Sequence, residues 1–184
     1  MTLARFLRII IDMKDGRTKK GKIIALRVVL TAACVALVAF IFYNSLKTGD
    51  ESAAESNIVT DTVQKIIGFF APKSWIANAT GAEYERLHSY VRTLAHFSEF
   101  GLLGALMSWC WRAYTSDKLC LLFPVCLVLF IPVLDESLQF LTAGRVADTS
   151  DLFVDTIGGI CGLAFATITL IIGKAVLSKK RKGD

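Results

Sequence analysis

The chain has 184 residues, of which 54% are hydrophobic and 20% charged, and its mean hydropathy is +0.53. This composition predicts a membrane protein and disfavours a soluble enzyme, a nucleic-acid-binding protein and a disulfide-rich scaffold, because a soluble domain of this length needs a more polar exterior. The basic residues behind the net charge of +5 crowd the two ends of the chain, as expected for tails beside an anionic cytoplasmic leaflet.

An all-α, four-helix transmembrane bundle is predicted from four apolar stretches, each near the roughly 20 residues that a spanning helix needs. The expected spans cover about residues 23–43, 94–111, 119–136 and 152–174. They belong to a membrane domain of residues 23–176, between basic tails of residues 1–22 and 177–184. The first stretch carries only Arg27, near its start, and no small-x-small cleavage site follows it, so we interpret it as an uncleaved anchor.

Two short amphipathic helices are expected outside the spans. In the N-terminal tail, apolar residues recur at i, i+3, i+4 and i+7, as in a helix that lies on the inner membrane surface; they are Leu3, Phe6, Leu7 and Ile10. The loop after the first span carries a similar stripe that ends before Pro72; it consists of Val59, Val63, Ile66, Ile67 and Phe70. For this second helix, capping the bundle and lying in the membrane surface are both open interpretations.

The distribution of Lys and Arg predicts that both termini are cytoplasmic. Seven basic residues precede the first span and four follow the last, and the short second connection holds Arg112 and Lys118. The long first loop carries six acidic against five basic residues, so it is expected outside. Two ends on one side require an even number of crossings, in agreement with four spans.

Ionisable residues within the spans carry most of the functional information, since a charge at the bilayer centre costs about 2.5–3.5 kcal/mol. Glu99 lies 13 residues from Arg112, or about 20 Å along a helix, well below the outer edge of a hydrocarbon core roughly 30 Å thick. The same measure places Asp135 and Asp155 at the outer ends of their spans. We therefore predict one outward-facing polar pocket, lined by Arg92, His96, Glu99, Asp135, Glu136, Gln139, Arg145, Asp151 and Asp155.

Structural explanations remain open for several of these residues. Carboxylates at the start of the fourth span complement the helix dipole, and those at the end of the third are ordinary end-of-helix charges. Arg145 is expected to pair with Asp135, Glu136 or Asp151, or to contact an anionic headgroup. Close helix packing is predicted at two sets of small residues, namely Gly101, Gly104, Ala105 and Ser108, and Gly158 with Gly162.

Two segments, RTLAHFSEFGLLG and DESLQFLTAGRVADTSDLFVDTIGGICG, together with the four-span plan, resemble the VanZ-like family, named for a protein linked to teicoplanin resistance. The resemblance covers roughly residues 37–173 and is strongest where DE, Q, GR, D and D-x-x-G-G follow in order. By resemblance, the family-typical positions are His96, Glu99, Asp135, Glu136, Gln139, Arg145, Asp151 and Asp155. An Asn is typical at the position of Asp155, so this chain adds a carboxylate there.

The resemblance implies a multi-pass protein of the bacterial plasma membrane, associated in some members with tolerance to glycopeptide or lipoglycopeptide antibiotics. It implies no agreed biochemical activity. The leading hypothesis is a non-enzymatic envelope protein whose pocket binds a membrane lipid headgroup, a lipid-linked cell-wall precursor, a glycopeptide-type ligand or a partner protein. No nucleic acid, cofactor or resident metal is expected, catalytic residues are not assigned, and the oligomeric state is open.

Two other functions remain as alternatives. A membrane-embedded enzyme would use His96 and Glu99 with Asp135, Glu136 or Asp155 to hold a hard metal ion or to serve as acid and base. The sequence contains neither HExxH nor GxSxG. A transporter is disfavoured because the inner half of every span is nearly free of ionisable groups and no inverted repeat is visible.

Overall fold

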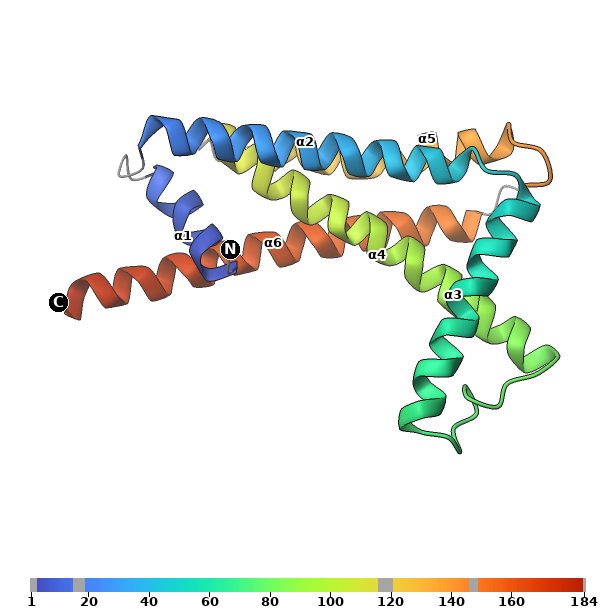
Figure 1. Ribbon diagram of the computed structural model, residues 1–184. Coiled ribbons are helices and arrows are strands. Elements are labelled where there is room, and N and C mark those ends of the chain that lie inside the picture. Colours follow the sequence, from blue (N-terminus) through green and yellow to red (C-terminus); the bar gives the residue numbers. More distant parts are fainter. Residues whose placement is uncertain (1–2, 15–18, 116–120, 146–148, 184) are drawn as a thin grey trace.

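The computed structural model describes residues 3–14, 19–115, 121–145 and 149–183, and every regular element in these ranges is an α-helix (Figure 1). The helices are α1 Leu3–Lys14, α2 Lys20–Ser45, α3 Gly49–Phe70, α4 Ala82–Tyr114, α5 Leu122–Phe140 and α6 Thr149–Gly183. The predicted all-α class is therefore confirmed for the described residues. The C-terminal basic tail continues α6 almost to the end of the chain.

Three of these helices are long and apolar enough to cross a membrane, namely Lys20–Ser45, Leu122–Phe140 and Thr149–Lys179. They coincide with the first, third and fourth predicted spans and indicate a membrane protein. α4 contains the predicted second span but does not reach the same apolarity, because His96 and Glu99 interrupt its apolar run. The fourth crossing therefore stays a prediction.

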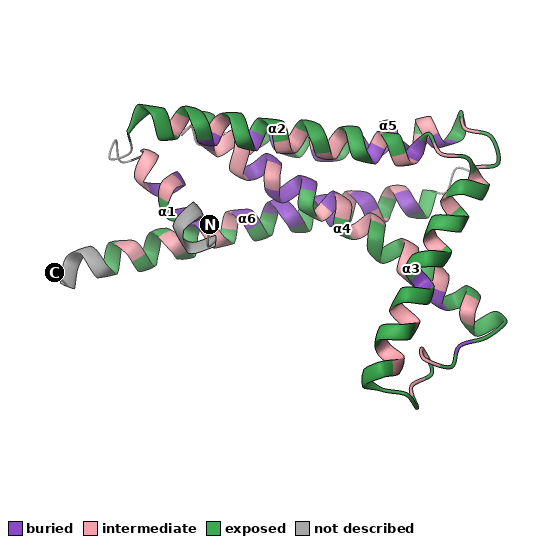
Figure 2. Cartoon of the chain, viewed as in Figure 1, coloured by how far each residue is buried: buried purple, intermediate pink, exposed green. Residues whose placement is uncertain are grey.

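α4 and α6 approach each other through facing small residues. A Cβ added at Gly162 would collide with the carbonyl oxygen of Gly101, and one added at Gly104 would collide with that of Gly159. Such contacts are open only to residues without a side chain, and they bring helices close where lipid supplies no hydrophobic driving force. Figure 2 shows the buried positions gathered where α4 and α6 cross, whereas α2 is largely exposed along its length. The predicted role of the small residues is confirmed.

The amphipathic N-terminal helix α1 forms as predicted, but its apolar side packs on protein. Leu7, Ile10 and Ile11 are buried in one cluster with Leu26 of α2 and Leu170 of α6. The expectation that this stripe lies on the inner membrane surface is therefore wrong for its described side chains. The sequence pattern specifies an apolar stripe, and the neighbouring helices supply its partner.

A second apolar cluster joins α2, α4, α5 and α6 and positions the polar residues beyond it. It contains Ile41 of α2, Phe100 of α4 and Ile131 of α5. Ser45 and Asp135 follow Ile41 and Ile131 by one helical turn, and Glu99 directly precedes Phe100. Packing of the apolar residues therefore brings polar side chains from three helices to the same position along the bundle axis.

α3 follows α2 after a three-residue connection and runs across the direction of the bundle (Figure 1). Thr48 caps its first turn, because its hydroxyl accepts a hydrogen bond from the backbone N–H of Glu51, and the Glu51 side chain accepts one from the Thr48 backbone. The backbone N–H of Gly49 donates to the carbonyl of Ala143, which fastens the start of α3 to the end of α5. The predicted helix in the first loop is confirmed, and it ends at Phe70, two residues before Pro72.

Candidate functional site

A buried carboxylate on α5 forms the floor of the site. Asp135 has only 1% of its surface exposed. The hydroxyl of Ser45 donates to its Oδ1, and Nε2 of Gln139, one turn further along α5, donates to its Oδ2 at 2.9 Å. These bonds hold the Asp135 carboxylate between the ends of α2 and α5.

A second buried carboxylate comes from α6. Asp155 is 1% exposed, and its Oδ1 lies 3.2 Å from Nδ1 of His96 on α4. Each of His96, Asp135 and Asp155 offers one atom that could bind a metal ion, and these three atoms all lie within 4.8 Å of one another. Three helices thus bring two carboxylates and an imidazole into one group, which we call the floor triad.

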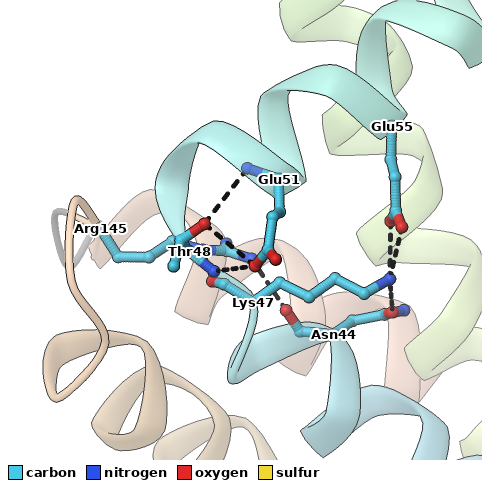
Figure 3. A network of polar contacts seen from close by, with 6 residues as sticks. All are labelled: Asn44, Lys47, Thr48, Glu51, Glu55 and Arg145. Atoms are coloured by element: carbon cyan, nitrogen blue, oxygen red, sulfur yellow. Dashed lines mark hydrogen bonds and ion pairs between the residues drawn. The ribbon is translucent and has the colours of Figure 1, made fainter.

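Arg145, in the connection between α5 and α6, ties several segments together. Its Nε and Nη2 donate to the backbone carbonyls of Lys47 and Asn44 at 3.2 and 2.9 Å (Figure 3). Its Nη1 donates to Oε1 of Gln139 at 3.1 Å. The expected ion pair of Arg145 with Asp135, Glu136 or Asp151 is not formed. The guanidinium instead donates to two backbone carbonyls where α2 ends, a use of Arg that a charge count does not predict.

Asp151 has a different basic partner. Its Oδ2 lies 3.0 Å from Nη2 of Arg92, so the first turn of α6 is bound to α4 by an ion pair. Both residues were predicted for the pocket, and the structure brings them together one turn outside the contact between His96 and Asp155.

A cavity of about 400 Å³ lies over these residues, between α2, α3 and α4. Six of the nine predicted residues line it, namely Arg92, His96, Glu99, Asp135, Gln139 and Arg145. A neighbouring cavity of about 870 Å³ shares Arg92 and Arg145 with it and adds Asp151. Asp155 lies beneath, within reach of His96.

Glu136 is not part of this arrangement. It lines a separate groove with apolar neighbours on α5 and α6, among them Val133, Phe140 and Leu152. In the structure Asp135 faces the cavity, whereas Glu136, rotated from it by about 100° on α5, faces this groove. The prediction that placed Glu136 in the pocket is therefore wrong.

The cavity also has polar residues that the sequence analysis missed. Asn44, Ser45 and Lys47 come from the end of α2, and Glu55 comes from α3. Nζ of Lys47 lies 2.7 Å from the Glu55 carboxylate and 3.0 Å from Oδ1 of Asn44 (Figure 3). A signal was present for Asn44, Ser45 and Lys47, since they directly follow the first apolar run and so lie at the depth predicted for Asp135 and Asp155.

Two chemistries suit this site. Its wall carries Lys47, Arg92 and Arg145, whose N–H groups suit an anionic group such as a phosphate. Its floor carries the triad, whose oxygen and nitrogen atoms suit a hard cation or proton transfer. Whether the predicted residues bind a ligand stays a prediction.

Comparison of the chain with curated proteins and with solved structures finds no match. A family model does match, that of VanZ/LLP1, over residues 30–171. This range takes in α2 from Leu30 onward, all of α3, α4 and α5, and most of α6, and therefore every residue that lines the two cavities. The resemblance noted in the sequence is confirmed, and the chain belongs to the VanZ/LLP1 family.

Proposed function

We propose that this protein acts in the bacterial cell envelope by binding an anionic lipid headgroup, or the phosphate of a lipid-linked cell-wall precursor, in the cavity between α2, α3 and α4. It does so without chemical change of the ligand. Binding or sequestration of such a molecule alters what the cell surface presents, which is a route to tolerance of glycopeptide-type antibiotics.

The observation that carries this proposal is the set of contacts made by Arg145. Among the described residues its hydrogen bonds go to three neutral acceptors, the Gln139 side chain and two backbone carbonyls, and none of these bonds goes to a carboxylate. The other two cations of the wall have partners, Lys47 with Glu55 and Arg92 with Asp151. A guanidinium that neutral acceptors hold on the wall of a cavity favours an anion.

The proposed topology supports access from outside. In it the chain crosses the plasma membrane four times through α2, α4, α5 and α6, with both termini in the cytoplasm. The basic residues before α2 and at the end of α6 then lie inside, as the positive-inside rule requires. The cavity lies at the opposite end of the bundle, where α2 and α5 end and α6 begins.

Mass spectrometry of lipids retained by the gently purified protein tests the binding function. We expect one anionic lipid class to be enriched on the wild type and lost from Arg145→Gln and Asp135→Asn. The matched control is Arg86→Gln, which removes an exposed cation from α4 outside both cavities.

Equal lipid content of Arg145→Gln and the wild type, at equal folded yield, would contradict binding at this cavity. Susceptibility of cells to envelope-directed antibiotics, compared at matched expression, tests the proposed role in antibiotic tolerance. If Arg145→Gln, Asp135→Asn and Arg86→Gln give the same susceptibility as the wild type, the proposed role is wrong.

A second candidate function, a membrane-embedded enzyme, is favoured by the floor triad. His96, Asp135 and Asp155 are close enough to share one metal ion or to pass a proton to a bound headgroup. Elemental analysis of purified protein, before and after chelation, tests the metal version. A stoichiometric metal that His96→Ala and Asp155→Asn both abolish would favour the enzyme over the binding protein.

A further inference from the structure

We propose that α3 is an outer-leaflet anchor: its apolar stripe beyond the cavity lies in the lipid surface beside the bundle. The stripe consists of Ile66 and Phe70 with the neighbouring Phe69, and we call it the α3 stripe. This inference depends on the membrane-crossing of the bundle and not on what the cavity binds.

One face of α3 is used in two ways along its length. Ser52, Ser56 and Val59 face the bundle and line the cavity. Ile66 and Phe70 continue the same series at helical spacing, 7 and 11 residues after Val59. The side of α3 that faces the cavity at its start therefore faces the same way at its end, where α2 and α5 no longer lie beneath it (Figure 1).

The α3 stripe is largely exposed. Ile66 is 52% exposed, and Phe69 and Phe70 are 82% and 79% exposed. In the second half of α3 the side chains that fasten the helix lie on another face: Gln64 donates to the backbone carbonyls of Ile76 and Ala79, and nearby Thr60 is fully buried. This half of α3 is thus held by one face while its apolar face stays open.

The level of α3 in the membrane follows from its attachments. It begins four residues after Ser45, the last residue of an apolar helix long enough to span, and its first backbone N–H donates to Ala143, beyond the end of α5. It then runs across the bundle at a slant. Its far end is displaced along the bundle toward the end where the two termini lie (Figure 1). A helix that starts at the end of the spans and turns this way stays at the lipid surface.

The charges along α3 agree with a lipid neighbour. The acidic residues of α3 lie between Asp50 and Asp61, whereas residues 62–82 contain two lysines, Lys65 and Lys73, and no acidic residue. Trp75 follows the helix and is 49% exposed. Aromatic side chains flanked by lysines are typical of the headgroup level, where the rings reach the acyl chains and the ammonium groups meet phosphate.

Fluorescence quenching measures the depth of the α3 stripe. In a variant whose Trp75, Trp109 and Trp111 are all changed to Phe, a single Trp is introduced by Phe70→Trp or by Ile66→Trp. The matched control is Asn57→Trp, which places the reporter on an exposed polar face of the same helix. Each protein is reconstituted in phosphatidylcholine–phosphatidylglycerol vesicles, with or without brominated acyl chains, and circular dichroism checks that the helix content is unchanged.

We expect brominated lipid to quench the Trp at positions 66 and 70 several-fold more than the Trp at position 57, and aqueous iodide to give the opposite order. Iodide quenching at 66 and 70 as strong as at 57, without bromine quenching, would show that the stripe faces water and overturn the proposal. Protection of positions 66 and 70 from both quenchers would also overturn it, because it would show that protein covers the stripe.

Discussion

Nδ1 of His96 on α4 lies 3.2 Å from Oδ1 of Asp155 on α6, and Asp155 is almost fully buried. α4 and α6 contact each other through backbone atoms at their glycines. The two helices are thus also joined by a polar contact near the start of α6. A buried polar group without a partner costs free energy, so each of the two side chains stabilises the other in this position.

Removal of one member of this pair should therefore destabilise the bundle. His96→Ala leaves the Asp155 carboxyl buried without its partner, and we expect a loss of about 1–3 kcal/mol in the free energy of unfolding. Asp155→Asn keeps a hydrogen-bonding group and should cost less. A double-mutant cycle by unfolding in detergent micelles measures the coupling, and strictly additive effects would contradict a direct interaction.

Substitution of glycine in the contact between α4 and α6 should separate the helices. A Cβ at Gly162 meets the Gly101 carbonyl oxygen, so Gly162→Ala forces the backbones apart and should cost about 1–3 kcal/mol, the range for overpacked cores. The control is Gly21→Ala in the first turn of α2, where an added Cβ meets nothing within 4 Å. Thermal unfolding in micelles compares the two, and an equal effect of both variants would contradict the close approach.

Replacement of Arg145 by lysine should loosen the connection between α2 and α3 although the charge is kept. The guanidinium donates to Asn44, Lys47 and Gln139 at once, and one ammonium group cannot reach all three acceptors in that geometry. We expect faster amide hydrogen exchange at residues 46–49 in Arg145→Lys. Arg86→Lys, on an exposed part of α4, should leave this exchange unchanged; the same rate in all three proteins would refute the bridging role.

The first turn of α3 should respond to pH through Glu51. Hydrogen bonds from the backbone N–H and the hydroxyl of Thr48 lower the pKa of the Glu51 carboxyl below its ordinary value. Because the folded-state pKa is the lower one, this stabilisation is present above the unfolded-state pKa and is lost as pH falls through the lowered value. Backbone chemical shifts of residues 49–52 should report fraying in that acidic range, and Glu51→Gln should lack the transition.

Accessibility to a membrane-impermeant thiol reagent tests the proposed topology. In a chain whose native cysteines are replaced by serine, Leu141→Cys lies exposed at the end of α5 and Lys179→Cys lies near the end of α6. We expect labelling of position 141 in intact cells and of position 179 only after permeabilisation. Labelling of both positions in intact cells would exclude a cytoplasmic C-terminus.

Much of this fold was predictable from apolar run length alone. The runs that became α2, α5 and α6 need no tertiary partner to form helices in lipid, because all their backbone hydrogen bonds are internal. The positions of Asp135 near the end of α5 and of Asp155 near the start of α6 followed in the same way, since position along a helix axis depends only on the rise per residue. The α3 helix was predicted by its periodicity and its stop before Pro72.

The rotation of each helix about its own axis was not predictable, and this rotation determined which residues line the site. Glu136 turned to a separate groove while its neighbour Asp135 faced the cavity. Asp151 paired with Arg92, and Arg145 bonded to backbone carbonyls instead of a carboxylate. Each of these outcomes depends on which side chains the neighbouring helices present, and one sequence spacing is compatible with several of them.

The amino-acid sequence by itself determined which segments are helical, how far along its helix each polar residue lies and which family the chain belongs to. Only the tertiary structure decided that α1 packs on α6 rather than on lipid, that Lys47 and Glu55 join the cavity, and that His96 meets Asp155. The reason is physical: hydrophobicity and helical rise act along a single segment, whereas contacts between side chains depend on how separate helices pack against one another.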